Sequence, residues 1–297
     1  MARKRILISG TTGFIGQQLI PYLSKNDCDV LCVSKNPNKL SNYSRVNTIG
    51  LDNLLKNKGS SELNKFEPEI FLHLGWAGTP PYGNEILQVN LESSLSLFKI
   101  AIESGVKKIF GVGSCYEYGD SLGLLMEEQG GLAPNTLFGE CKIEIHKNLI
   151  SLASKNAVDH SWIRIFHGFG PGQRETSFIP KIIKAATTGD TPFIDFPNKQ
   201  IDLIHVFDIV RGLRELLISK EAIGIFNLGS GSSDSLLNYA NMVYKVLNLP
   251  QLEAIQSVSA KSTSSWADIS RIENLTGWRP KEKFEDSISK LVLEYSQ

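Results

Sequence analysis

Short apolar runs alternate with amphipathic stretches through the first half of the chain. The stretch 87–104, for example, carries apolar residues at the three- and four-residue spacing of a helix. The apolar runs have the length and composition of buried strands, and they comprise residues 6–9, 30–33, 70–74, 109–112 and 162–166. Strands that alternate with helices are typical of a parallel sheet covered by helices on both faces. The pattern therefore predicts an α/β fold with a doubly wound, mostly parallel Rossmann sheet.

The pattern changes after about residue 167. Gly and Pro become frequent and the periodicity becomes irregular, although residues 203–206 and 225–228 are again typical of strands. We therefore expect a Rossmann domain formed by residues 1–166 plus about 200–228. A smaller C-terminal lobe would consist of residues 167–199 and 229–297, so the chain would cross between the two domains more than once.

Composition and charge narrow the class of ligand. The 297 residues are 41% hydrophobic, enough for a full core, and 31 Lys and Arg balance 31 Asp and Glu. No basic stripe or acidic tail stands out, so neither nucleic acid nor a membrane surface is favoured as a partner. No apolar run is long enough to span a bilayer. The four cysteines show neither metal-ligand spacing nor a disulfide framework, so we expect free thiols in a cytoplasmic protein without a metal site.

A glycine-rich turn follows the first predicted strand. Residues 10–16 read GTTGFIG and lead into a helical run with Leu19, Ile20 and Leu23. Glycines at such a turn let the backbone approach a pyrophosphate, whose charge is stabilised by the amides at the start of the helix. The turn predicts a dinucleotide site with contacts from Gly10, Thr12, Gly13, Phe14, Ile15 and Gly16.

The end of the second predicted strand bears on the choice of dinucleotide. NAD-preferring versions carry an acidic residue there, which accepts hydrogen bonds from the adenosine ribose. This chain has Ser34 and Lys35 instead. Because no carboxylate repels a 2'-phosphate and Lys35 is available to pair with one, NADP(H) is favoured, while NAD(H) stays open. Asp52 is a candidate to accept from the adenine amino group or, alternatively, to cap the helix after it.

A series of motifs in a shared order resembles the extended short-chain dehydrogenase/reductase family, especially its nucleotide-sugar epimerases, dehydratases and 4-ketoreductases. The resemblance runs from about residue 5 to residue 295. It rests on GTTGFIG at 10–16, LHLGWAG at 72–78, Asn90 in QVNLESS, GSCYEYG at 113–119, PNTLFGECK at 134–142, RIFHGFGPG at 164–172, IDLIHVFD at 201–208, NLGSG at 227–231 and TGWRP at 276–280.

The resemblance implies a catalytic group of a Ser or Thr, a Tyr and a Lys. In the family the hydroxyls bond the reacting sugar oxygen, while the lysine binds the nicotinamide ribose and lowers the tyrosine pKa from about 10. Ser114 and Lys142 match two of the positions, but Phe138 stands at the third. Phenylalanine has no proton to give, and the loss of a general acid typically costs roughly 10²- to 10⁴-fold in rate.

Three explanations of Phe138 are open. It is a deliberate Tyr→Phe change that keeps ligands bound without turnover, or a natural replacement in which Tyr116 or a water molecule relays the proton. In the third explanation, catalysis has been lost and the protein binds or senses a nucleotide.

The residues after Ser114 argue against dehydration. Family dehydratases carry an acidic pair there, whereas this chain has Cys115 and Tyr116, followed by Glu117. What remains is the reduction of a keto-sugar by exchangeable NADPH, or epimerisation with tightly held NAD. The Ser34–Lys35 pair favours the reductase, and the reductases similar to CDP-abequose synthase, which act on 4-keto-6-deoxysugars, match best in length and pattern.

Further positions carry over from the family one by one. The resemblance implies cofactor contacts from Leu74, Gly75, Trp76, Asn90, Phe166 and Gly168. It implies contacts to a nucleotide-diphosphate sugar from Cys115, His167, Ser177, Phe178, Ile179 and Lys181. Structural roles are expected for Arg164, His205 and Asp208.

One departure from the family affects the substrate diphosphate. Ile201 replaces an arginine that commonly pairs with a nucleotide phosphate, so Lys181, Lys261 or Arg271 would have to supply the positive charge. The helices expected at 87–104 and 138–154 correspond to those that pair as a four-helix bundle in the family. We therefore expect a homodimer with isologous contacts.

Overall fold

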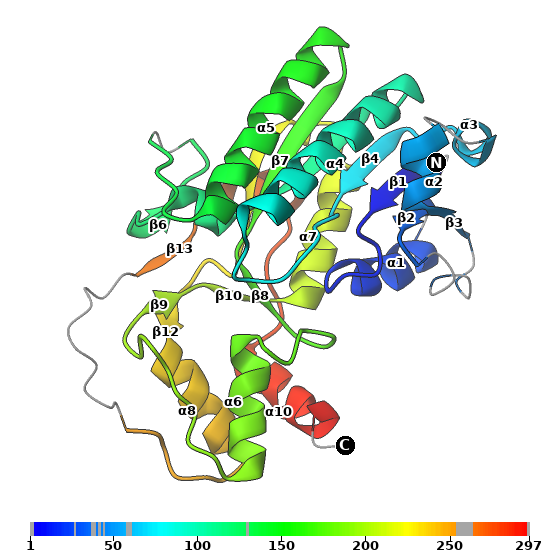
Figure 1. Cartoon of the computed structure of the whole chain (residues 1–297). Coiled ribbons are helices and arrows are strands. Elements are labelled where there is room, and N and C mark those ends of the chain that lie inside the picture. Colours follow the sequence, from blue (N-terminus) through cyan, green and yellow to red (C-terminus); the bar gives the residue numbers. More distant parts are fainter. Residues whose placement is uncertain are drawn as a thin grey trace.

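The computed structural model describes residues 3–26, 28–36, 40, 43, 45–57, 61–128, 131–253 and 264–295. Lys261, one of the predicted phosphate partners, lies outside the described residues. A large body with a central sheet lies above a smaller lobe in Figure 1.

Parallel strands form the central sheet in the order β11-β7-β5-β4-β1-β2-β3. The strands are β1 (Lys4–Ser9), β2 (Cys28–Ser34), β3 (Val46–Gly50), β4 (Ile70–His73), β5 (Lys108–Ser114), β7 (Asp159–Ile165) and β11 (Gly224–Leu228). The strand order reverses between β1 and β4, and in open parallel sheets ligands bind beyond the carboxyl ends of the strands at such a point. The predicted doubly wound α/β fold is confirmed, and each predicted strand of the first half lies in this sheet.

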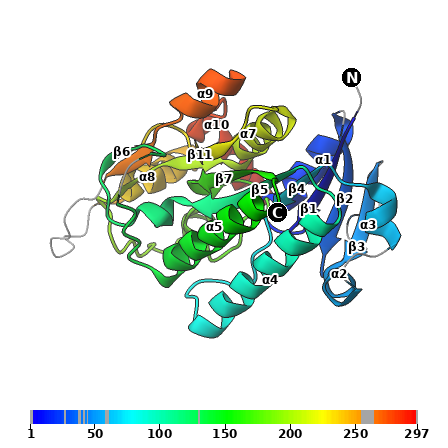
Figure 2. The ribbon, with the colours of Figure 1, turned by 90° about the horizontal axis from the view of Figure 1, so that it is seen from above.

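Alternate residues of the strands serve two separate cores, one on each face of the sheet. Ile6 and Ile8 of β1 belong to the core that also contains residues of α1 (Gly16–Lys25) and α7 (Val206–Ile218). Leu7 belongs to the opposite core, which contains residues of α4 (Asn84–Glu103) and α5 (Leu137–Lys155). Figure 2 shows α4 and α5 side by side on one face, with α7 and α9 (Ser270–Thr276) on the other. The face that carries α4 and α5 is also lined by α2 (Leu51–Asn57) and α3 (Ser61–Phe66).

The smaller lobe has its own hydrophobic core. It contains buried residues from α6 (Phe178–Thr188), α8 (Leu236–Val246) and α10 (Phe284–Tyr295), together with Phe169 and Leu203. Short strand pairs lie outside the central sheet, namely β8 (His167–Phe169) with β10 (Leu203–His205), β9 (Gln200–Ile201) with β12 (Asp234–Ser235), and β6 (Gly123–Leu125) with β13 (Ser265–Ala267).

The C-terminal part of the chain, which was predicted to lie in the lobe, contributes to the core of the lobe and also to a core of the large body. Ala267, Ile272 and Trp278 pack in the core of the large body, beside α7 and β11, although residues 229–297 were expected in the lobe. The periodicity of so short a helix as α9 does not reveal which core it serves, because that depends on where the chain returns after α8.

A buried carboxylate ties the carboxyl end of β5 to β7. Glu117, in the short 3-10 helix η2 (Cys115–Tyr118), is fully buried and accepts hydrogen bonds from the Ser114 backbone N–H (2.8 Å) and from Trp162 Nε1 (3.0 Å). Its second oxygen pairs with Arg164 Nε at 2.8 Å. Arg164 is therefore structural, as expected, and Glu117 is not available to act as a dehydratase acid.

The Glu117–Arg164 pair provides a test of what holds this end of the sheet. Glu117→Leu should lower the free energy of unfolding by about 3–5 kcal/mol, because it leaves the Arg164 charge buried without its carboxylate partner. Glu128→Leu is the matched control, since Glu128 is 83% exposed in its pair with Arg271 and such pairs contribute about 0–1 kcal/mol. Urea denaturation measures both variants, and equal destabilisation would contradict the assignment.

Candidate active site

The glycine turn lies between β1 and α1, and two of its glycines have no room for a side chain. Gly10 has φ of +75°, and a Cβ there would lie 2.6 Å from the Gly75 backbone nitrogen. A Cβ on Gly16 would lie 2.4 Å from the Gly10 carbonyl oxygen. The backbone therefore approaches itself closely here, and the amino end of α1 faces the carboxyl ends of the strands, where a pyrophosphate is stabilised.

A cavity of about 520 Å³ opens beside this turn. It brings together residues that lie far apart in the sequence and that were predicted to contact the dinucleotide, namely Gly10, Thr12, Gly13, Ser34, Lys35, Asp52, Leu74, Gly75, Trp76 and Asn90. The predicted dinucleotide contacts thus converge on one space at the switch point of the sheet.

The far end of this cavity carries an unpaired positive charge. Ser34 Oγ accepts a hydrogen bond from the Asn36 backbone N–H (3.0 Å) and lies 3.3 Å from Thr12 Oγ1, which fixes the end of β2 against the turn. Lys35 is exposed next to it and has no ion-pair partner among the described residues. Asp52 stands in the first turn of α2 and lines the same cavity.

Asn90 holds the loop after β4 in place and does not cap a helix. It lies in the middle of α4, where its amide donates to the carbonyls of Ala77 (3.0 Å) and Ile86 (2.7 Å). Its side-chain oxygen accepts from the Ala77 backbone N–H at 2.7 Å. Asn90 therefore shapes the cavity wall formed by Leu74 to Gly78.

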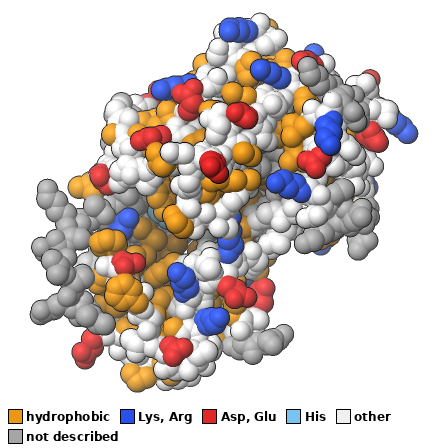
Figure 3. Space-filling model, viewed as in Figure 1, with side chains coloured by type: hydrophobic (Ala, Val, Ile, Leu, Met, Phe, Trp, Pro, Cys, Tyr) orange, Lys and Arg blue, Asp and Glu red, His pale blue; other side chains and the backbone are white. Residues whose placement is uncertain are grey.

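A second cavity, of about 640 Å³, adjoins the first, and Leu74 and Trp76 line both. Its lining brings together the expected catalytic positions and most of the remaining expected cofactor contacts, namely Phe14, Ile15, Ser114, Tyr116, Phe138, Lys142, Phe166 and Gly168. On the face shown in Figure 3, hydrophobic side chains gather in a hollow between the body and the lobe.

Lys142 is buried, and its ammonium has one hydrogen-bond acceptor among the described residues. Nζ donates to the Val112 carbonyl at 2.8 Å and lies 4.2 Å from the centre of the Trp76 ring. Burial lowers the Lys142 pKa from 10.5 to about 8, although the Glu117 carboxylate acts in the opposite direction. An ammonium carries three donors, so the group can also donate to a ribose hydroxyl in the cavity that Lys142 lines.

An aromatic cluster surrounds Phe138. The Tyr82 ring stacks on it with 5.3 Å between ring centres and 19° between planes, and Trp76 and Tyr116 meet it edge-on at 5.0 Å and 5.8 Å. Tyr82 lies in the loop before α4, after the cis Pro80–Pro81 bond, and also lines the second cavity. Tyr82 was not among the residues predicted from the sequence, although an aromatic residue soon after LHLGWAG was a signal for it.

Cys115 and His167 contact each other beside the cavity and are not among the residues that line it. Cys115 Sγ lies 3.8 Å from His167 Nδ1. Burial raises the Cys115 pKa to about 12 and lowers the His167 pKa to about 4, so the pair is neutral near pH 7. A neutral buried thiol is a poor nucleophile, so the pair does not support thiol catalysis.

The structure places several predicted substrate contacts away from both cavities. Ile179 is buried in the lobe core, and Ser177 and Phe178 lie at the start of α6, with Lys181 exposed one turn further on. Arg271 pairs with Glu128 and donates to the Ile223 carbonyl at the amino end of β11. The role predicted for Arg271 is therefore wrong, because the cavities lie at the carboxyl ends of the parallel strands and Arg271 lies at their amino ends. Ile201, which replaces the family arginine, is buried in β9.

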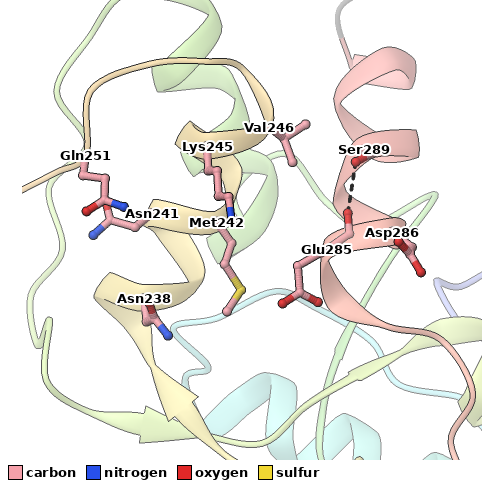
Figure 4. A pocket seen from close by; sticks show the side chains of 9 residues that line it. All are labelled: Asn238, Asn241, Met242, Lys245, Val246, Gln251, Glu285, Asp286 and Ser289. Carbon is pink, nitrogen blue, oxygen red and sulfur yellow. Dashed lines mark hydrogen bonds between the residues drawn. The ribbon is translucent and has the colours of Figure 1, made fainter.

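Figure 4 shows a further cavity, of about 430 Å³, between α8 and α10 in the lobe. Asn241, at its rim, exchanges hydrogen bonds with the Leu252 backbone, and Ser289 donates to the Glu285 carbonyl. None of the predicted site residues lines this cavity.

In the part of the chain that the structure describes, no helix is both long and apolar enough to cross a membrane. No group of three or more His, Cys, Asp or Glu side chains there is placed to hold a metal ion. None of the four cysteines, all of which lie among the described residues, forms a disulfide bond.

Comparison with known proteins agrees with this geometry. Residues 6–229 match the model of the NAD dependent epimerase/dehydratase family. The chain belongs to this family. The match spans the sheet from β1 to β11, so the family resemblance inferred from the motifs is confirmed.

Similar proteins are named for different reactions. A dTDP-4-dehydro-6-deoxyglucose reductase of Escherichia coli is 26% identical over 98% of both chains. An ADP-L-glycero-D-manno-heptose-6-epimerase of Brachyspira hyodysenteriae is 22% identical over 84% of this chain and 83% of its own length. A solved structure of UDP-glucuronic acid 4-epimerase from Bacillus cereus with UDP-glucuronic acid and NAD aligns with a TM-score of 0.85, 21% identity and 99% coverage of both chains. The chain is thus similar to reductases and epimerases of sugar nucleotides.

Dinucleotide binding should depend on pH through Lys142. Because the ammonium form predominates below about pH 8 and is lost above it, affinity should decrease as pH rises through that value. Calorimetric titration with NAD(H) or NADP(H) across this range measures the effect. Lys142→Met should abolish the pH dependence, while Lys155→Met, exposed at the other end of α5, should retain it. An unchanged pH profile in Lys142→Met would contradict the assignment.

Proposed function

We propose that this protein reduces a nucleotide-linked 4-keto-6-deoxysugar with NADPH. The observation that carries the proposal is the shared cavity of Ser114 and Lys142, which adjoins the glycine-turn cavity through Leu74 and Trp76. The full-length relative named as a 4-keto-6-deoxysugar nucleotide reductase supports the choice of reaction.

The residues present fit a nicotinamide dinucleotide. At Gly10 and Gly16 a single added Cβ would collide with backbone, which is the close approach that a pyrophosphate-binding turn requires. The bound dihydronicotinamide supplies a hydride to the sugar carbonyl carbon. Ser114 donates a hydrogen bond to the carbonyl oxygen, and Lys142 binds the nicotinamide ribose and stabilises negative charge nearby.

Lys35 supports NADP(H) over NAD(H). Its charge has no ion-pair partner among the described residues, and neither Ser34 nor Asn36 beside it would repel a 2'-phosphate. Several similar solved structures are complexes with NAD, which keeps NAD(H) as the alternative cofactor.

Substitution of Lys35 tests the cofactor preference. Lys35→Ala should weaken NADPH binding about tenfold or more and leave NADH binding nearly unchanged, because a charge-assisted hydrogen bond is worth about 1.5–3 kcal/mol. Lys56→Ala, at the exposed end of α2, is the matched control and should change neither affinity. Equal losses for the two cofactors would contradict the preference.

Epimerisation is the second candidate function, since two of the similar proteins described above are epimerases. An epimerase returns the hydride that it takes, so it would copurify with NAD and show no net consumption of cofactor. A third candidate is non-catalytic dinucleotide binding, which the absence of a hydroxyl at Phe138 favours.

The proposal extends to assembly and location. The helices α4 and α5 border a shared groove, whose lining includes Leu87 and Leu91 of α4 and Cys141 and Ile143 of α5. We propose a homodimer that pairs these helices about a two-fold axis. We also propose that the protein acts on its nucleotide-sugar substrate in the cytoplasm.

Phe138→Tyr tests the reaction class. We expect NADPH oxidation with a panel of nucleotide-linked 4-keto-6-deoxysugars, in the chain with Phe138 or in this variant, with one cofactor consumed per sugar reduced. If nothing replaces the missing acid, the variant should gain roughly 10²- to 10⁴-fold in kcat. Absence of sugar-dependent oxidation in both proteins would reject the reductase proposal.

A further inference from the structure

The proposed reduction needs a proton for the sugar oxygen, and Phe138 cannot provide it. Two phenol groups line the same cavity, those of Tyr82 and Tyr116. We propose that Tyr82 donates this proton, so that the catalytic acid has moved from α5 to the loop before α4. This inference rests on the proposed reductase function and identifies the residue that would complete it.

The stacking of Tyr82 on Phe138 is the main evidence. Their ring planes differ by 19° and their centres lie 5.3 Å apart, so the Tyr82 phenol occupies the layer next to the ring that a catalytic tyrosine would fill. The Lys142 ammonium lies 5.7 Å from the centre of the Phe138 ring. The Phe138 ring, on which Tyr82 stacks, is thus also a neighbour of the ammonium that would stabilise a tyrosinate.

The Tyr82 hydroxyl has no hydrogen-bond partner among the described residues, and its ring lines the cavity. Its proton is thus available to an oxygen atom of a ligand in that cavity. The Trp76 ring meets the Tyr82 ring edge-on, with 5.9 Å between ring centres, so Tyr82 packs between Trp76 and Phe138.

The loop that carries Tyr82 is held at both ends. Asn90 fixes Ala77 through two hydrogen bonds, and α4 begins at Asn84. Between these points, the Arg174 guanidinium donates to the Gly78 carbonyl at 3.3 Å, which links the loop to the segment that enters the lobe. A short loop anchored in this way keeps the phenol against the cavity.

Tyr116 fits the role less well. It meets Phe138 edge-on, with 84° between ring planes, and its other face contacts His167 at 5.7 Å. Burial raises the Tyr116 pKa above its usual value, with the neighbouring Cys115 and Tyr82 acting in the same direction. A tyrosine with a raised pKa is a weaker proton donor.

The proposed step balances as follows. Hydride from the reduced nicotinamide forms a C–H bond at the carbonyl carbon, and the carbonyl π electrons move to oxygen. That oxygen takes the proton from Tyr82 Oη to give the alcohol, while the nicotinamide is oxidised. The Tyr82 phenolate is then reprotonated by water, and Ser114 donates a hydrogen bond to the oxygen throughout.

The test combines Tyr82→Phe with Phe138→Tyr in a double-mutant cycle. Tyr82→Phe retains the stacked ring and removes only the hydroxyl, so it should fold normally and lose roughly 10²- to 10⁴-fold in kcat for NADPH-dependent keto-sugar reduction. Phe138→Tyr alone should gain less than about tenfold, because an acid is already present. In the double variant, the new hydroxyl on α5 should restore activity to near that of Phe138→Tyr.

Two further variants serve as controls, and thermal unfolding checks the fold of each protein. Tyr43→Phe alters an exposed tyrosine that lines neither cavity and should leave kcat unchanged. Tyr116→Phe tests the competing donor, and its kcat should fall far less than that of Tyr82→Phe.

The outcomes separate this proposal from the proposed function. If the chain with Phe138 reduces a keto-sugar and Tyr82→Phe retains that activity, or Tyr116→Phe loses it instead, the role of Tyr82 is rejected while the reductase function stands. If only proteins with Phe138→Tyr are active, Tyr82 does not replace the acid. If no variant reduces any keto-sugar, the reductase function is rejected, and the role of Tyr82 with it.

Discussion

The buried ion pair between Glu117 and Arg164 sets the geometry of the whole site. Glu117 accepts from the Ser114 backbone and from Trp162, so one carboxylate joins the end of β5 to β7 and fixes where Ser114 stands. Removing such a charge from water is costly unless every lone pair is used, and here the oxygens face three donors. Because these donors occupy both oxygens of Glu117, this carboxylate is not available as an acid in the cavity.

A second buried charge, on Lys142, has fewer partners. Its ammonium donates to one carbonyl and lies beside one indole ring. These contacts do not offset the loss of hydration, so burial lowers the Lys142 pKa. A ligand that accepts hydrogen bonds from this ammonium relieves part of that cost. The polar needs of Lys142 thus favour a ribose at the junction of the two cavities, where Trp76 lines both.

Phe138 retains the packing role of the aromatic ring at its position. Three aromatic neighbours contact it, and one of them carries a phenol that stacks on it. Because ring stacking and proton donation are separable, a cavity can keep its shape when the hydroxyl is displaced to an adjacent ring.

Much of the body could be predicted from the sequence. The strands 6–9 and 70–74, found as Lys4–Ser9 and Ile70–His73, follow from local apolar periodicity, and the glycine turn follows from its place between strand and helix. The prediction was wrong for Arg271, because nothing local indicates that Glu128 and the far edge of the sheet engage it. It likewise assigned Ala267 and Trp278 to the lobe, since the core that a returning segment joins depends on the path of the chain.

The sequence by itself determined the fold class, the family and the presence of Ser114 and Lys142 without a tyrosine at 138, because motifs and periodicity are local properties. Only the tertiary structure decided that Glu117 turns inward to Arg164 and that Tyr82, 56 positions from Phe138 in the numbering, stacks on its ring. These are contacts between elements distant in sequence. Their geometry is set by how sheet, helices and loops pack together, which no short pattern of residues encodes.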